Sequence, residues 1–234
     1  MQEYSIFVMA FVLGIKHAIE PDHIVAISTI VCKTRKISKA AILGVLWGIG
    51  HTATLFITGM IGIMMKYTIP EKLAVLLERG VGVMIMILAI NLLLNYKKPL
   101  YAHTHEHEHM HSHNHFHKHS HVYGDQHTHE HEHANNDRSK RKILDYIKSL
   151  LVGFVHGLAG SAVMILLTLT TVKSYWEGAL FIIIFGVGTI ISMLVYTTIL
   201  GIPFALNHNN RVHNYINIII GSVGIIFSFY YIFH

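Results

Sequence analysis

The sequence predicts an all-α polytopic membrane protein, and three observations support this fold class. The chain has 234 residues, of which 52% are hydrophobic and only 13% are charged, whereas an average soluble domain contains about 25% charged residues. The apolar residues form six long runs, and a transmembrane helix needs about 20 predominantly apolar residues. Most lysine and arginine residues lie between these runs, as they do in the loops that flank membrane spans.

Six predicted transmembrane helices divide the chain into three regions. The helices cover residues 4–31, 40–65, 73–95, 143–171, 178–200 and 213–233. Residues 1–95 are predicted to form a three-helix membrane unit, residues 96–142 a hydrophilic loop, and residues 143–234 a second three-helix unit. The first apolar run lacks a preceding basic segment and is too long for the core of a cleaved signal, so we interpret it as the first helix.

The first predicted helix is expected to be broken near Pro21. Its apolar run covers 28 residues, 4–31, which is more than one straight helix needs to cross about 30 Å of hydrocarbon. Proline removes a backbone donor and disfavours helical geometry at the preceding residue, here Glu20. Within a membrane such a break is tolerated only where it is buried in protein or lines a cavity.

The basic residues predict how the helices are oriented. Thirteen of them lie on one side of the predicted helices, at Lys33, Arg35, Lys36, Lys39, Lys97, Lys98, Lys118, Arg138, Lys140, Arg141, Lys142, Lys148 and Arg211. Four lie on the other side, at Lys66, Lys72, Arg79 and Lys173. Because cytoplasmic loops are enriched in lysine and arginine, we expect a multi-pass protein of the cell (plasma) membrane with both termini outside and the long loop in the cytoplasm.

The two halves of the chain resemble each other weakly. The segment Val12–His17 corresponds to Leu151–His156, 139 residues later, and Trp47–Thr52 corresponds to Phe185–Thr189 at almost the same offset. Glycine is common in transmembrane helices, so chance matching is the alternative interpretation. Three helices per half would insert the second half upside down, and inverted repeats are typical of secondary transporters, which bind their substrate near the bilayer midplane.

Ionisable side chains lie near the middle of three of the apolar runs. They are Lys16, His17, Glu20, Asp22 and His23 in the first run, His51 in the second and His156 in the fourth. Ionisable groups are costly at this depth and usually mark an ion or substrate path. Imidazole and carboxylate groups without thiolate suit nickel, cobalt, zinc or copper(II), and the one cysteine, Cys32, excludes a disulfide framework or a Cys-based zinc site.

The predicted metal ligands are His17, Asp22, His23 and His51. A helix break at Pro21 would let Asp22 and His23 converge with His17 on one ion. Glu20 and His156 are additional or alternative ligands, and His156 taken alone is interpreted equally well as a hydrogen-bonded core histidine.

The loop at 96–142 is rich in histidine. Fourteen of the 21 histidines fall between His103 and His133, and ten of them alternate with other residues from His103 to His121. Such a segment cannot build an apolar core, so we expect it to be disordered without metal and to bind additional divalent ions. A metal buffer, a capture arm and a sensor that limits flux are three interpretations of it, each accessory to the membrane site.

The segment His17-Ala-Ile-Glu-Pro-Asp-His23-Ile24 resembles the His-x4-Asp-His signature of the nickel/cobalt transporter superfamily. The segment Gly50-His51-Thr52 is similar to the Gly/Ser-His-Ser/Thr motif of the next helix in those proteins, and the His-rich loop resembles that of efflux members. The chain departs from the uptake permeases in the segment Gly153–Ser161, which carries no acidic residue. The resemblance implies Ni²⁺ or Co²⁺ transport and leaves its direction open.

The leading hypothesis is a transporter of Ni²⁺ or Co²⁺ that works by alternating access. A Zn²⁺ transporter of the same architecture and a non-transporting membrane metal sensor or accessory protein are the alternatives. An enzyme is not expected, because no predicted helix carries a His-Glu-x-x-His motif and the chain has no Walker-type loop. The expected partners are the divalent metal ion, the lipid bilayer and a cytoplasmic metallochaperone, with no nucleic acid and no cofactor beyond the transported ion.

Overall fold

A computed structural model describes residues 2–65, 69–95, 143–160, 172, 174–207 and 209–233, and these residues form helices without strands. The helices are α1 (Gln2–Ala18), α2 (Pro21–Val31), α3 (Ile37–Met65), α4 (Glu71–Asn95), Ile143–Gly160, α6 (Tyr175–Leu206) and α7 (Asn210–Phe233). All but α1 and α2 are long and apolar enough to cross a membrane. The His-rich loop and the predicted fourth helix beyond residue 160 lie outside the described residues.

The predicted break in the first apolar run is confirmed. Helix α1 ends at Ala18, and α2 begins with Pro21 at its first position. Glu20 caps α2 with an extended backbone, at φ −63° and ψ 145°. This conformation is the one that a following proline favours, because the proline ring clashes with a helical residue before it.

Helices α3, α4, α6 and α7 begin two or three residues before the predicted apolar runs, and among these four only α6 ends beyond its predicted run, at Leu206. Helix α6 has 32 residues, and at 1.5 Å per residue it is about 48 Å long, more than the hydrocarbon core requires. Its start is set by Ser174, whose side-chain oxygen accepts a hydrogen bond from the backbone N–H of Glu177 at 3.2 Å. Polar capping, rather than hydrophobicity, therefore sets this boundary.

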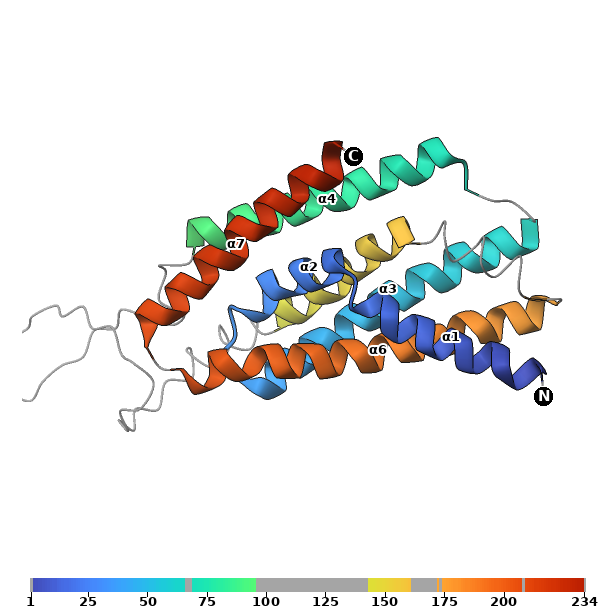
Figure 1. The fold of residues 1–234 in the computed structure, drawn as a ribbon, viewed down its shortest axis with the longest axis horizontal. Helices are drawn as coiled ribbons and strands as arrows, with labels where there is room; N and C mark the ends of the chain where they lie inside the picture. Colours follow the sequence, from blue (N-terminus) through green and yellow to red (C-terminus); the bar gives the residue numbers. More distant parts are fainter. Residues whose placement is uncertain are drawn as a thin grey trace, which may run out of the picture.

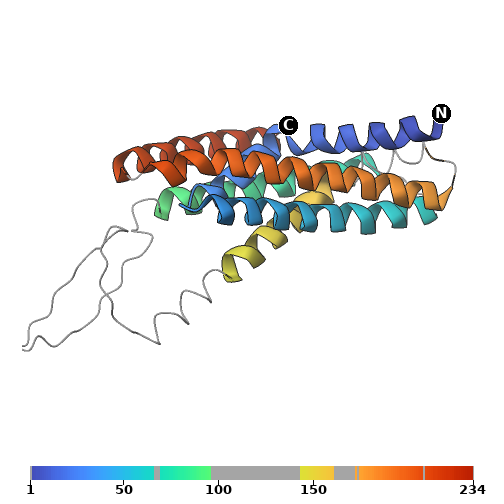
Figure 2. The ribbon, with the colours of Figure 1, turned by 90° about the horizontal axis from the view of Figure 1, so that it is seen from below.

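Figure 1 shows the helices in two groups with the shorter helices α2 and Ile143–Gly160 between them, and Figure 2 shows that the N-terminal end of Ile143–Gly160 (yellow) leans away from the long helices. Helix α6 packs against both α3 and α1, and α4 packs against α7. Helix α2 contacts α3, α4, α6 and α7, so it lies between the two groups. Figure 1 also shows that α1 and α2 run in the same direction and that the helices after them alternate in direction, with α3 and α6 antiparallel.

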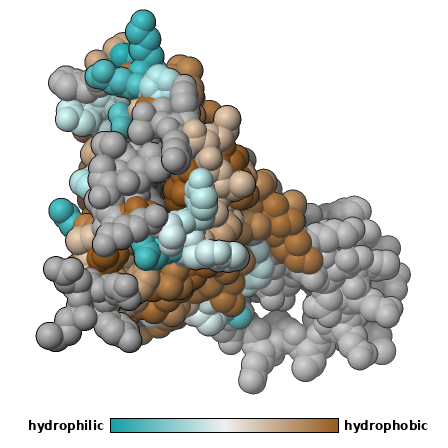
Figure 3. Space-filling model, turned by 90° about the vertical axis from the view of Figure 1, so that its right-hand side faces the viewer, coloured by the Kyte–Doolittle hydropathy of each residue, from teal (hydrophilic) through white to brown (hydrophobic). Residues whose placement is uncertain are grey.

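The outside of the bundle is apolar, as lipid contact requires. Large hydrophobic side chains are exposed along the long helices, among them Ile61, Ile87, Leu94, Ile219 and Ile226. Figure 3, which faces one end of the bundle, shows hydrophobic residues in brown among the surface residues. A soluble monomer rarely exposes a continuous apolar surface larger than a few hundred Å². The chain is therefore a multi-pass membrane protein.

Polar contacts tie several helix ends together at one end of the bundle. The Arg35 guanidinium donates to the Asn210 side-chain oxygen at 2.6 Å, and Lys39 pairs with Asp145 at 2.5 Å. Cys32 caps the end of α2 and is fully buried, and burial raises the pKa of its thiol to about 12. These contacts bring the segment after α2 against the starts of α7 and of Ile143–Gly160.

Glycines allow two helix pairs to approach backbone to backbone. A Cβ atom on Gly14 of α1 would overlap the carbonyl oxygen of Phe185 in α6. A Cβ atom on Gly153 of the helix Ile143–Gly160 would overlap the carbonyl oxygen of Trp47 in α3. Gly14 corresponds to Gly153, and Trp47 to Phe185, in the sequence repeat. Small residues at membrane helix interfaces permit this close packing.

A second pair of glycines repeats the same relation. Gly188 of α6 lies against the carbonyl oxygen of Phe11, and Gly50 of α3 lies against that of Leu150. Phe11 and Leu150 are again separated by 139 residues, and Gly50 and Gly188 by 138. Each half of the chain therefore packs on the other through corresponding residues.

Candidate metal site

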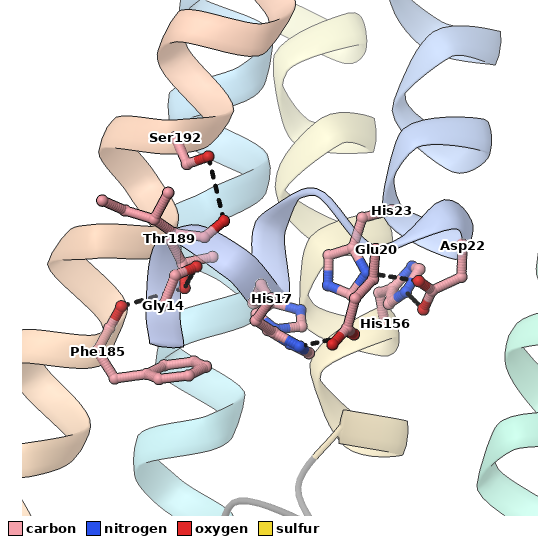
Figure 4. Close-up of polar contacts among 11 residues, drawn as sticks. Gly14, His17, Glu20, Asp22, His23, His156, Phe185, Thr189 and Ser192 are labelled. Atoms are coloured by element: carbon pink, nitrogen blue, oxygen red, sulfur yellow. Dashed lines mark hydrogen bonds and ion pairs between the residues drawn. The ribbon is translucent and has the colours of Figure 1, made fainter. Parts of the chain in front are cut away.

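The break between α1 and α2 sets the position of the first four polar side chains. His17 lies in the last turn of α1, Glu20 in the connection, and Asp22 and His23 in the first turn of α2. The backbone N–H of Glu20 donates to the His17 carbonyl at 3.1 Å, and the Ile24 N–H donates to the Glu20 carbonyl at 3.1 Å. The break thus turns both helix ends toward the same region (Figure 4).

One series of hydrogen-bonded side chains runs from the exposed Glu20, through His17, to the buried His51. The His17 Nδ1–H donates to Glu20 Oε2 at 2.8 Å, and the Glu20 side chain is 47% exposed. The other ring nitrogen, His17 Nε2, lies 3.0 Å from His51 Nε2 in α3. The imidazole of His51 is fully buried.

A second series of hydrogen-bonded side chains is centred on Asp22. The His23 Nδ1–H donates to Asp22 Oδ1 at 2.9 Å, and the His156 Nε2–H donates to Asp22 Oδ2 at 2.8 Å (Figure 4). Both imidazoles are 1% exposed. His156 comes from Ile143–Gly160, so the carboxylate joins the two halves of the chain. A buried charge requires such partners, because an unpaired one would be strongly unfavourable.

The two hydrogen-bonded series contact each other through the imidazole rings of their histidines. The ring centroid of His23 lies 4.5 Å from that of His17, 5.0 Å from that of His51 and 4.3 Å from that of His156. All six side chains predicted as metal ligands therefore lie in one connected cluster. Three segments distant in sequence contribute to it: the α1–α2 break, α3 and Ile143–Gly160.

Three buried ring nitrogens in this cluster have no hydrogen-bond partner in the described structure: His23 Nε2, His51 Nδ1 and His156 Nδ1. In a neutral imidazole one nitrogen carries the proton and the other a lone pair. Because His23 and His156 donate through their other nitrogens, each unpartnered nitrogen on these two rings is a lone-pair site. Buried polar atoms without partners are rare in native structures, and these lone pairs are free to bind an ion.

Two sets of side chains have the spacing of metal ligands. The ligand atoms of His17, His23 and His51 all lie within 4.8 Å of one another, and so do those of Asp22, His23 and His156. Two nitrogens at about 2.1 Å from one ion are about 3 Å apart when they subtend a right angle. The 3.0 Å separation of the His17 and His51 nitrogens has this value.

The carboxylates of Glu20 and Asp22 fix the orientation of the imidazole rings by accepting hydrogen bonds from them. Glu20 accepts from His17 and Asp22 accepts from His23, which leaves the Nε2 atoms of both rings facing the shared space. Metal-bound histidines commonly donate their other ring N–H to a carboxylate, which fixes the tautomer and the ring orientation. The arrangement can hold one divalent ion on imidazole nitrogens.

Trp47 belongs to the cluster, although the sequence pattern pointed to it only as part of the repeat. Its indole is stacked on the His51 ring, with centroids 5.1 Å apart and planes at 9°. Phe185, its counterpart, lies 5.4 Å from the His17 ring. The position of Trp47 one helical turn before His51 was the available signal.

The fold and this cluster define a multi-pass membrane protein with a buried histidine and carboxylate site. Residues 57–230 match the family described as the cytochrome C biogenesis protein transmembrane region. Over 231 residues the chain is 42% identical to the urease accessory protein UreH of Bacillus sp. (strain TB-90), an alignment that covers 98% of this chain and 91% of the relative. The chain belongs to this family of membrane proteins, together with UreH.

More distant relatives are chloroplast proteins of Arabidopsis thaliana. The proteins FOR GROWTH AND FERTILITY 1 and 2 are 28% and 26% identical over 82% of this chain. The chain spans 48% and 45% of their lengths, about half in each case. No solved structure matches the chain. None of these relatives is described as an enzyme.

Proposed function

We propose that this chain transports a divalent transition-metal ion, Ni²⁺ or Co²⁺, across the membrane. The observation that carries the proposal is the convergence of His17, His23 and His51 ring nitrogens within 4.8 Å inside a bundle of apolar helices. Ionisable groups at such depth are costly and usually serve an ion path. Imidazole is a good ligand for first-row divalent metals, and nickel and cobalt lie high in the affinity order.

In this proposal the three imidazoles bind the ion, and Asp22 and Glu20 hold their rings. Asp22 also belongs, with His23 and His156, to the second set of ligand atoms, and this set is an alternative position for the ion in the transport cycle, at which Asp22 itself is a ligand. The two sets share His23, and an ion can pass from one set to the other by exchanging the remaining ligands.

An inverted repeat of two three-helix units would supply the alternating access. The reciprocal contacts support it: Gly14 packs on Phe185 as Gly153 packs on Trp47, and α3 runs antiparallel to α6. The site lies where the units meet, as in other transporters built from inverted repeats. In the proposed topology the α1–α2 pair crosses the membrane as one broken span among six, and the basic end of the bundle faces the cytoplasm.

The relative UreH is named a urease accessory protein, so its name describes an accessory role. The same observation keeps a second candidate open, namely a membrane accessory protein or sensor that binds the metal without moving it. A Zn²⁺ transporter would use the same imidazoles, since the ligand types suit zinc as well. A cytoplasmic metallochaperone would be the natural partner of the transporter.

Metal flux through the purified protein tests the proposal. We expect proteoliposomes containing the full chain to take up Ni²⁺ or Co²⁺ faster than empty liposomes, with Zn²⁺ and Mg²⁺ measured in parallel. Accumulation in cells expressing the chain gives the direction, because import raises and export lowers the intracellular metal. Binding of metal by folded protein without any flux would replace the transporter by the accessory protein.

Deletion of residues 103–133 is expected to change the apparent affinity or the regulation of transport and to leave transport itself in place. The reason is that the membrane ligands alone provide a fixed geometry, whereas the loop contributes many interchangeable imidazoles. Initial rates of uptake at several metal concentrations check this. A correctly folded deletion protein with no flux would show that the loop is part of the transport path.

A further inference from the structure

Trp47 contacts several members of the histidine and carboxylate cluster, although its position in the sequence relates it only to His51. The indole is fully buried and stacks on His51 at a centroid distance of 5.1 Å. Its ring also makes edge contacts with His23 at 5.0 Å and His156 at 5.2 Å, with planes at 71° and 67°. One side chain thus packs against three imidazoles from three segments of the chain.

The backbone of Trp47 has little freedom to move. Gly153 lies directly against the carbonyl oxygen of Trp47, so the helix Ile143–Gly160 packs closely on α3 at this residue. The stacked indole in turn holds the plane of the His51 ring, which is the ring that faces His17 through Nε2. A change in this plane would carry the His51 nitrogen away from the other two ligands.

Stacking also favours the metal-bound state of His51. Coordination withdraws electrons from an imidazole and gives the ring cationic character. Indole has the most electron-rich face among the side chains and attracts a cation placed over it. By contrast, the indole N–H is buried without a hydrogen-bond partner in the described structure, so it contributes no bond that the cluster depends on.

We propose that Trp47 is a positioning residue of the metal site: its indole face fixes the ring of His51 in the ligand orientation and stabilises it when the ion is bound. The proposal rests on the proposed function, because it assigns a role toward the same ion. It also predicts that the ring matters and the indole N–H does not.

Two substitutions separate the aromatic face from the rest of the side chain. Trp47→Phe keeps an aromatic face and removes the unpartnered N–H, whereas Trp47→Leu removes the face and keeps an apolar side chain. From the usual strength of aromatic pairs we expect Trp47→Leu to raise the apparent KM for Co²⁺ uptake about threefold to tenfold. Trp47→Phe should restore a KM close to that of the unchanged protein, and the maximal rate should change little in both.

Fluorescence provides a readout that does not depend on transport. The chain has two tryptophans, and the other, Trp176, is 86% exposed, so a Trp176→Phe protein emits from Trp47 alone. Co²⁺ quenches indole emission at short range. We expect saturable quenching of this protein by Co²⁺, and loss of the saturable part when His51→Ala is added.

The outcomes distinguish this inference from the function on which it rests. Normal Co²⁺ uptake by the unchanged protein, together with an unaltered KM in Trp47→Leu, would overturn the role of Trp47 and leave the transporter in place. Quenching that persists in the His51→Ala protein would also overturn it. Absence of uptake by the folded, unchanged protein, together with absence of saturable quenching in the folded Trp176→Phe protein, would remove the metal site itself.

Discussion

Replacement of His23 by alanine is expected to abolish metal transport. His23 is the residue that belongs to both sets of candidate ligand atoms, and its ring contacts His17, His51 and His156. Removing a group that merely orients a metal ligand costs about 10–100-fold in metal affinity or activity, so removing this imidazole should cost at least about 100-fold. Initial uptake rates of Ni²⁺ and Co²⁺ in proteoliposomes measure the effect.

The matched control is His213→Ala, because His213 is also a buried histidine. It lies in the first turn of α7, is 4% exposed and packs on Phe204, away from the candidate ligand sets. Size-exclusion profiles of both variants report whether the fold survives. Undiminished uptake by folded His23→Ala protein would refute the site.

Replacement of Gly153 by alanine is expected to destabilise the bundle strongly. The added Cβ would overlap the Trp47 carbonyl oxygen, and the rings of His51 and His156, which follow Trp47 and Gly153 on the same two helices, have centroids only 5.9 Å apart. Overpacking of this kind typically costs about 1–3 kcal/mol. Thermal unfolding of the detergent-solubilised protein measures the loss, and metal uptake should fall with it because Trp47 lies at the site.

Gly80→Ala serves as the control for this substitution. Gly80 lies in α4, and an added Cβ there meets no atom within 4 Å. Alanine is favoured over glycine inside a helix by up to about 1 kcal/mol, so this variant should be at least as stable as the unchanged protein. Equal melting temperatures for the two variants would show that the close crossing of α3 and Ile143–Gly160 is not required.

The sequence was informative about the site because charge is so costly in a membrane. His17, Glu20, Asp22 and His23 stood out against an apolar background, and Pro21 explained how they escape a regular helix. Periodicity had no part in this prediction, since every side of a membrane helix is apolar. For the same reason the sequence did not single out Trp47 as a site residue, because a large apolar side chain is common in an apolar run.

Pairing between the site residues could not be read from the sequence. Asp22 is a predicted metal ligand, and in the structure its two oxygens accept hydrogen bonds from His23 and His156, with which it forms one of the two candidate ligand sets. His156 was open to two interpretations, and the contact with Asp22 across 134 residues places it in the cluster. Which of two polar groups binds an ion and which orients the other depends on distances of a few tenths of an ångström.

The sequence by itself determined the membrane class, the broken first helix and the identity of the polar residues, because hydropathy, proline chemistry and the cost of buried charge act locally along the chain. Only the tertiary structure decided that these residues form one site, because its members come from three segments that meet where glycines such as Gly153 let helix backbones touch. Close packing of two helix backbones depends on the side chains of both helices, so the sequence of one segment does not predict it.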